Sequence, residues 1–298
     1  MKWLLILSIL FSATTFGQDS KSTKVDSLLS IYSSNAHDTT RFKAANQLTS
    51  FYAKNRNYQE AFDLATELVA STDSLIKTAK LKEDEIAFVR NITASSYINL
   101  ATVLVRTGNF PDATKNCETG LEIAKEIENN KSIATAYNVQ ATILAYQGRI
   151  PEGLEYFLLA LKVREEAGDE AGAAASYNNI GNIYAMLSEY DKAIEYFEKS
   201  LAYKEKVGDE FGIARTQMNL GAVNRDRGTY AQSHEYLLQA LDYFSREDYP
   251  GDVAGIHMNL GHLYTSHGNY HLALDYYDSA LVVYQQLGNI KVVSQAYN

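Results

Sequence analysis

The chain has 298 residues, of which 46% are apolar and only three are proline, so it can bury a large core and its composition favours helices. Its formal net charge is −9, from 36 acidic and 27 basic residues, which leaves no electrostatic basis for binding nucleic acid. A single cysteine, Cys117, excludes an intramolecular disulfide and any zinc site built from several cysteines, and its register indicates a buried core position.

Residues 1–17 have the pattern of a secretory signal peptide. Lys2 provides a basic start, an apolar run extends to Phe11, and the small residues Thr15 and Gly17 lie three and one positions before Gln18. The apolar run is too short to span a bilayer comfortably, which predicts cleavage after Gly17, with a retained signal anchor as the alternative. The mature chain is therefore expected outside the cytoplasm.

Residues 18–38 are predicted to form a polar stub and a short helix, and residues 39–93 a degenerate helical hairpin with an insertion. Ala45, Leu48 and Tyr52 lie on one face of the first helix of this hairpin, and Tyr58 begins the second. The spacing from Tyr58 to Phe110 is 52 residues instead of the 40 found further along the chain. We expect the extra residues to lengthen the second helix and to form a charged loop over residues 80–85.

From residue 94 onward the sequence repeats with a period of 40. The residue that begins each second helix recurs as Phe110, Ile150, Tyr190, Tyr230 and Tyr270. The predicted units are 94–133, 134–173, 174–213, 214–253 and 254–293, and residues 294–298 begin a further unit. Because each unit of a solenoid exposes an apolar edge to the next, this incomplete unit predicts that the 298 residues are part of a longer protein.

Two positions in every unit carry small residues, which allow the two helices of a hairpin to cross closely. On the first helix they are Ala101, Ala141, Gly181, Gly221 and Gly261, and on the second helix Ala113, Gly153, Ala193, Ser233 and Ala273. Turn glycines such as Gly168 and Gly208 are expected to end the second helices.

The unit from residue 174 carries the spacing Tyr177-x2-Ile180-Gly181-x2-Tyr184, followed by Ala193-x3-Phe197. This pattern resembles the tetratricopeptide repeat, with tyrosine in place of the usual tryptophan and about six residues more than the usual 34. The resemblance covers residues 39–298. It implies an all-α, right-handed superhelical solenoid of antiparallel helix hairpins whose first helices line a concave face.

The resemblance also implies where a ligand binds. In peptide-binding members of the family, asparagine on the first helices holds the ligand backbone, since an amide offers both a donor and an acceptor. The candidate binding residues on the concave face are Asn99, Asn138, Asn178, Asn179, Asn182, Arg215, Asn219, Arg225, Asn259 and His262. The alternative is that the asparagines only hydrogen-bond the adjacent helix. Few basic residues accompany them, so capture of a C-terminal carboxylate in the manner of the family is not predicted.

No pattern for catalysis, a cofactor or a metal is present. The glycines lie at packing and turn positions, without the lysine of a phosphate-binding loop. His267 and His271 are four residues apart but lie on either side of a predicted turn, so a metal site is not expected. The chain is interpreted as a non-catalytic scaffold without a cofactor.

The predicted partner is a protein or an extended peptide, and membrane attachment would come only through a segment outside this chain. The exported start, Asp38-Thr39-Thr40-Arg41 and the 40-residue repeats resemble the sensory half of Gram-negative signalling proteins of the histidine kinase or cyclase type. The resemblance implies a periplasmic sensor portion of a longer protein. The alternative is a free periplasmic or secreted assembly factor without an output domain.

Overall fold

The computed structural model describes residues 19–33, 38–54, 57–78 and 82–286, and these residues form helices without any strand. The predicted signal peptide and residues 294–298 lie outside the described residues. The helices in the described chain are α1 (Asp19–Ser33), α2 (Asp38–Lys54), α3 (Tyr58–Thr78), α4 (Glu83–Arg106), α5 (Phe110–Glu126), α6 (Asn130–Tyr146), α7 (Ile150–Glu166), α8 (Glu170–Met186), α9 (Tyr190–Val207), α10 (Glu210–Arg227), α11 (Tyr230–Arg246), α12 (Pro250–Ser266) and α13 (Tyr270–Gln286).

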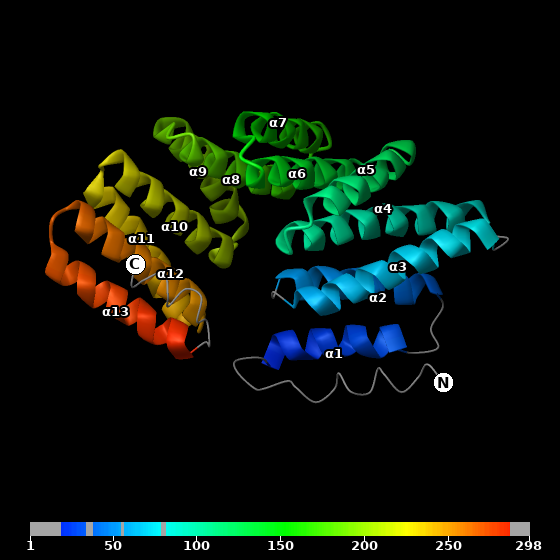
Figure 1. Ribbon diagram of the computed structural model, residues 1–298, viewed down its shortest axis with the longest axis horizontal. Helices are drawn as coiled ribbons and strands as arrows, with labels where there is room; N and C mark the ends of the chain where they lie inside the picture. Colours follow the sequence, from blue (N-terminus) through cyan, green and yellow to red (C-terminus); the bar gives the residue numbers. More distant parts are fainter. Residues whose placement is uncertain (1–18, 34–37, 55–56, 79–81, 287–298) are drawn as a thin grey trace.

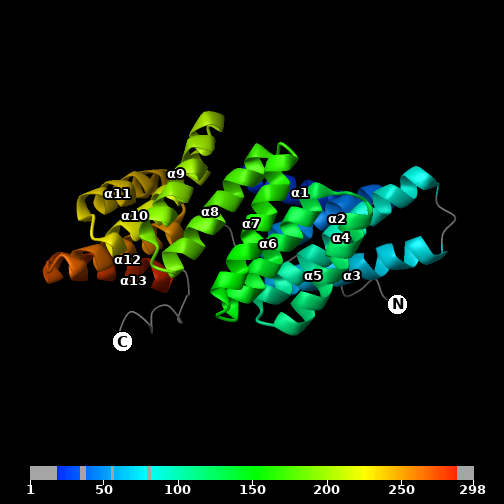
Figure 2. The same cartoon turned by 90° about the horizontal axis from the view of Figure 1, so that it is seen from above.

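The helices from α2 onward pair into six antiparallel hairpins, α2–α3 to α12–α13, and each hairpin packs against the next. The hairpins follow one another around an arch, with α1 against α2 at one end and α13 at the other (Figure 1). Figure 2 shows the same stack from above, with α8 between the α2–α7 part and the α10–α13 part. The all-α solenoid predicted from the repeat is confirmed.

The N-terminal helices differ in extent from the sequence-based expectation. Helix α1 begins at Asp19, so the residues expected to form a polar stub lie within it. The insertion lengthens both neighbouring helices, since α3 has 21 residues and α4 has 24. Glu83 and Glu85, expected in a charged loop, belong to the first turn of α4, where Glu85 Oε2 accepts a hydrogen bond from the Lys82 backbone N–H at 2.9 Å. Acidic residues stabilise this end of a helix because its free N–H groups carry partial positive charge.

The turns repeat the same local chemistry along the chain. Gly168 and Gly208 have φ angles of +66° and +69°, as expected for glycines that end helices. Asp169 and Asp209 then accept a hydrogen bond from the backbone N–H three residues later, at 2.9 and 3.0 Å. This N-cap starts the next first helix immediately after the turn.

The small residues inside the hairpins provide room for a large side chain from the partner helix. A methyl group on Gly181 would lie 2.8 Å from the ring of Phe197, which is only 1% exposed. At Gly261 the same group would lie 2.4 Å from the ring of Tyr277. Gly181 therefore packs against the aromatic ring of Phe197, whereas the small residue Ala193 was expected opposite it.

Cys117 is fully buried, as expected, and burial raises the pKa of its thiol to about 12. Among the described helices none is long and apolar enough to cross a membrane.

Candidate functional site

The first helices of the hairpins form the inner layer of the solenoid. Helix α4 packs against both α2 and α6, and α10 packs against α12, whereas the second helices make no comparable contacts with one another in the described chain. Helices that approach one another in this way lie on the side with the smaller radius of curvature. The candidate residues on α4, α6, α8, α10 and α12 are therefore carried by the concave layer.

Four of the asparagines of the inner layer form amide–amide hydrogen bonds between neighbouring hairpins. Asn99 Nδ2 donates to Asn46 Oδ1 at 2.7 Å, and Asn219 Nδ2 donates to Asn178 Oδ1 at 3.1 Å. Each of these amides keeps further donors or acceptors. The bonds join adjacent helices, as the alternative interpretation supposed, and they fix the orientation that the remaining amide groups present to the groove.

Asn138 and Asn179 have the same spacing in the sequence as Asn178 and Asn219, but they do not hydrogen-bond each other. The amide of Asn138, with its oxygen and nitrogen assigned to satisfy its surroundings, accepts from Arg164 Nη1 and Nη2 at 3.0 and 2.9 Å. Asn179 lines a pocket instead, and Asn182 is exposed.

This pocket, of about 400 Å³, lies where α8, the end of α9 and the start of α10 meet. Its polar lining includes Asn178, Asn179, Lys204, Asp209 and Arg215, and its apolar lining includes Phe211. The Arg215 guanidinium lies over the Phe211 ring, 5.8 Å from its centroid.

Two cations and one carboxylate, Asp209, line this pocket, so its net charge is positive. Lys204 Nζ donates to Thr216 Oγ1 at 2.6 Å, and in the described chain neither Lys204 nor Arg215 forms an ion pair. Burial lowers the pKa of Lys204, and Asp209 and Arg215 oppose each other as smaller influences on it. An anionic group in this pocket would face two cations and two amides, beside the Asp209 carboxylate that accepts from the Gly212 N–H.

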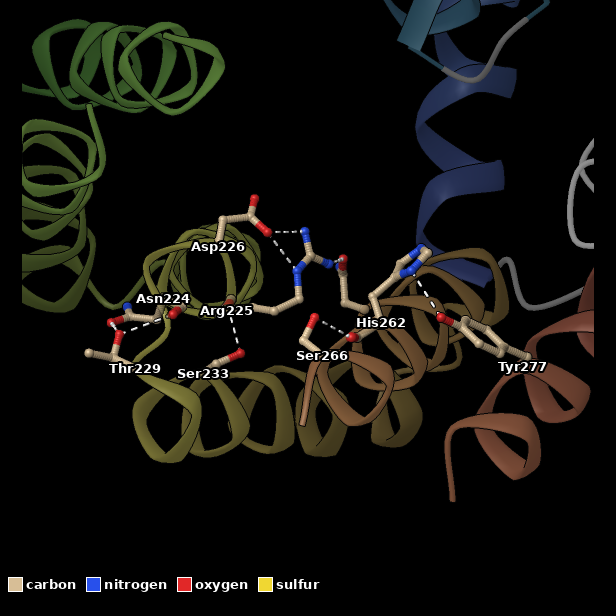
Figure 3. Close-up of polar contacts among 10 residues, drawn as sticks. Asn224, Arg225, Asp226, Thr229, Ser233, His262, Ser266 and Tyr277 are labelled. Carbon is tan, nitrogen blue, oxygen red and sulfur yellow. Dashed lines mark hydrogen bonds and ion pairs between the residues drawn. The ribbon is translucent and has the colours of Figure 1, made fainter. Parts of the chain in front are cut away.

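A second polar cluster joins α10, α12 and α13 (Figure 3). Arg225 donates to the neighbouring Asp226 at 2.8 Å and to Asn259 Oδ1 at 3.3 Å, so its charge is already paired. His262 Nδ1 and the Tyr277 hydroxyl are 2.9 Å apart. Burial, and to a smaller degree Arg225, lowers the pKa of His262, which keeps the ring neutral near pH 7. This cluster has hydrogen-bonding capacity but less free charge than the pocket at Lys204.

Family models for the tetratricopeptide repeat match residues 93–131, 132–206 and 212–286. The chain belongs to the tetratricopeptide repeat family. No curated protein sequence matches this tetratricopeptide chain.

Several solved structures share the tetratricopeptide fold. BtubC (BKLC) from P. vanneervenii is 20% identical with a TM-score of 0.63, and the match covers 75% of this chain and 92% of that one. A Rap protein complexed with Competence and Sporulation Factor is 15% identical with a TM-score of 0.66, covering 91% and 77%. The signal transduction ATPase PH0952 from Pyrococcus horikoshii, which has a tetratricopeptide repeat sensor, is 16% identical with a TM-score of 0.64, covering 90% and 41%. At these identities the similarity establishes the fold.

Two cations of the tetratricopeptide inner face, Arg164 and Lys204, were not among the predicted site residues. They belong to second helices, where a cation in the last turn is ordinarily solvated. The signal that could have identified them is their spacing of 40 residues combined with a glycine eight positions later in each unit, Gly172 and Gly212. In the described chain no group of three or more histidine, cysteine, aspartate or glutamate side chains could hold a metal.

Proposed function

We propose that this tetratricopeptide chain is the ligand-binding portion of an exported signalling protein and that its inner face binds an extended, acidic peptide. The observation that carries the proposal is the pocket at Lys204 and Arg215, where two cations that form no ion pair in the described chain outnumber the single carboxylate, Asp209, although the net charge of the chain is −9. Two like charges in one pocket repel each other, and an anionic ligand group relieves this repulsion.

The neighbouring amides complement that charge. Asn178 and Asn219 share one hydrogen bond. Their remaining donors and acceptors, together with the amide of Asn179, are available to a peptide backbone. A row of amides follows an extended backbone irrespective of its side chains. Selectivity would then come from the charged pocket, which favours glutamate or aspartate.

Two further observations support a sensory role. The first 17 residues have the composition of a signal peptide, which suits a periplasmic location. Among the proteins of similar fold, one is complexed with Competence and Sporulation Factor and another carries its tetratricopeptide repeats as a sensor.

Binding is tested by fluorescence anisotropy with the chain beginning at Gln18 and labelled ten-residue peptide pools of serine, leucine and tyrosine. The pools differ only in two positions that carry glutamate, glutamine or lysine. The glutamate pool is expected to bind best and to weaken with added salt. Loss of a charged hydrogen bond costs about 1.5–3 kcal/mol, so K204M/R215A should bind the glutamate pool at least tenfold more weakly.

The matched control is R149A, which removes an exposed arginine that pairs with Glu152 at the start of α7. It should bind like the wild type. Equal binding of the glutamate and glutamine pools, or equal weakening by R149A, would contradict the proposal. Export is tested separately by mass spectrometry of the periplasmic fraction of a Gram-negative host, where a chain beginning at Gln18 is expected and an intact Met1 in the cytoplasm would refute it.

A further inference from the structure

One position in the last turn of the second helices lies at the junction between successive first helices. It is occupied by Ala124 at the α4/α6 junction, Arg164 at α6/α8, Lys204 at α8/α10 and Phe244 at α10/α12. The four side chains differ greatly in length and charge. The helices around them recur with the same period, so the four junctions can be compared at this position.

The first helices approach one another to different degrees at these junctions. Helices α4 and α6, which meet beside Ala124, pack extensively, and α10 and α12, beside Phe244, pack over a shorter stretch. Helices α8 and α10, beside Lys204, barely touch, and α6 and α8, beside Arg164, approach least. The junctions with a cation are thus the two most open ones.

The two cations reach between the helices, because their stems are long and their polar ends have partners there. Arg164 Nη1 donates to the Gly172 carbonyl at 2.9 Å and to Ser176 Oγ at 2.7 Å, and its guanidinium also contacts Asn138 on α6. Lys204 donates to Thr216, which has the same register as Ser176. Arg164 therefore links three helices, α6, α7 and α8.

Phe244 behaves differently although it is also large. Its ring is fully buried and packs edge-on against Phe211 and Tyr249, so it stays within the apolar core of its own junction. The side chains at the open junctions, Arg164 and Lys204, differ from Phe244 in their length and polar end more than in their volume.

At both cation junctions a glycine in the first turn of the next first helix makes room for the capping aspartate and for the stem of the cation. A methyl group on Gly172 would meet the Asp169 carboxylate and lie 2.8 Å from Arg164 Cδ, and one on Gly212 would meet the Asp209 carboxylate and lie 3.0 Å from Lys204 Cδ. Glycine inside a helix costs up to about 1 kcal/mol relative to alanine. Glycine is present at both cation junctions, where Ser132 and Asp252 stand at the other two, and the cation stem shares the space that it leaves with the aspartate cap.

We propose that Arg164 and Lys204 are positioning residues that hold the inner face open at the α6/α8 and α8/α10 junctions. The consequence for binding rests on the proposed function: bulky side chains of a bound peptide enter at these two junctions, and the closed α4/α6 junction admits only the backbone. The register of the peptide on the groove is thereby restricted.

The spacing is measured by double electron–electron resonance on ligand-free protein with Cys117 replaced by alanine. Labels at Ser95 on α4 and Ala175 on α8 span the α4/α6 and α6/α8 junctions together, and labels at Ala175 and Gly255 on α12 span the α8/α10 and α10/α12 junctions together. R164A should shorten the first distance by on the order of 2 Å and leave the second unchanged, since packed helices differ by about this much according to their contact side chains. K204A should do the reverse.

The conservative variant R164K, which keeps length and a donor, should restore the wild-type distance. Unchanged distances in folded R164A, or shortening of both distances by either variant, would overturn the proposal. If R164A does not fold, R164Q is measured instead and should shorten the first distance by a smaller amount. These distances are measured without a ligand, so they test the positioning role alone. If the distances shift but no peptide binds, the proposed function is refuted and the positioning role remains.

Discussion

The hairpins α4–α5 and α6–α7 achieve close helix crossing differently from the three hairpins that follow. In the first two, the glycine lies on the second helix: a methyl group on Gly120 would meet Ile98 at 2.8 Å, and one on Gly153 would meet the Ala141 carbonyl oxygen at 2.9 Å. In the last three, the glycine lies on the first helix and faces a side chain, as Gly181 faces Phe197. Close crossing is thus a property of the pair of helices, and either one can supply the missing side chain.

The hairpins also differ in how the first helix is attached to the hairpin before it. Tyr97 on α4 donates from its hydroxyl to Asp73 at 2.6 Å, and Tyr177 on α8 donates to Glu165 at 2.7 Å, so each tyrosine ties its first helix to the preceding second helix. At the equivalent place on α10, Gln217 bonds Gln239 within its own hairpin. Helix α10 therefore lacks the bond that attaches α4 and α8.

The largest effect is expected from G181A. The added methyl group would lie 2.8 Å from two atoms of a ring that is fully buried and cannot move aside. Overpacking of this kind costs about 1–3 kcal/mol, which the better helix propensity of alanine only partly offsets. Urea unfolding followed by circular dichroism should show a lower midpoint with a similar slope.

The matched control for G181A is G255A, also on a first helix. There the methyl group meets only the Tyr284 hydroxyl, at 3.9 Å, so helix propensity alone should raise stability by up to about 1 kcal/mol. Equal midpoints for the two variants would mean that Phe197 does not constrain Gly181.

G153A should have a smaller effect of about 1 kcal/mol, but of a different kind. Its methyl group would meet the backbone oxygen of Ala141, which can move only if the two helices separate. Hydrogen exchange should therefore increase along α6 and α7 together, whereas G181A should increase exchange mainly around Phe197. The same exchange pattern in both variants would contradict the distinction between the two regions.

The register of these glycines could be predicted from the sequence because a period of 40 fixes which positions face each other. The side chain that each glycine faces could not be predicted in this way. Phe197, Leu237 and Tyr277 occupy one register, yet they differ in size and burial. The candidate site was predictable to a similar degree. The asparagines were identified by register, but the bond from Asn219 to Asn178 and the position of Lys204 depend on how far apart the helices lie, which no local pattern encodes.

Y177F tests the attachment of α8 to the preceding helix α7. Loss of the bond to Glu165 should lower stability by about 0.5–1.5 kcal/mol. That bond, with some burial, raises the pKa of Tyr177 to about 12 from 10.0, so its contribution is complete below pH 10 and is lost as the pH rises towards 12. The free energy of unfolding of Y177F should therefore fall less between pH 10 and 12 than that of the wild type. Parallel pH profiles would show that the hydroxyl is not bonded in solution.

Q217Y should transfer this attachment to α10 and give the smallest effect. Glu205 precedes position 217 by the same twelve residues that separate Glu165 from Tyr177, and Tyr236 stands where Tyr196 contacts the Tyr177 ring, 6.1 Å between centroids. Both partners of a tyrosine are thus already in register, and only the bond from Gln217 to Gln239 is lost. That bond is exposed and contributes little.

The expected gain is about 0.5–1 kcal/mol, because one exposed amide bond is exchanged for a hydrogen bond to a carboxylate and a ring contact. Q217F provides the ring without the hydroxyl, so the difference between the two variants isolates the bond to Glu205. That difference should shrink by about half when Glu205 is also changed to glutamine, because a neutral acceptor replaces a charged one. If Q217Y and Q217F are equally stable beside an intact Glu205, the geometry of the α9/α10 junction differs from that of α7/α8. The wider separation of the first helices at α6/α8 is then the first cause to examine, by the same distance measurements.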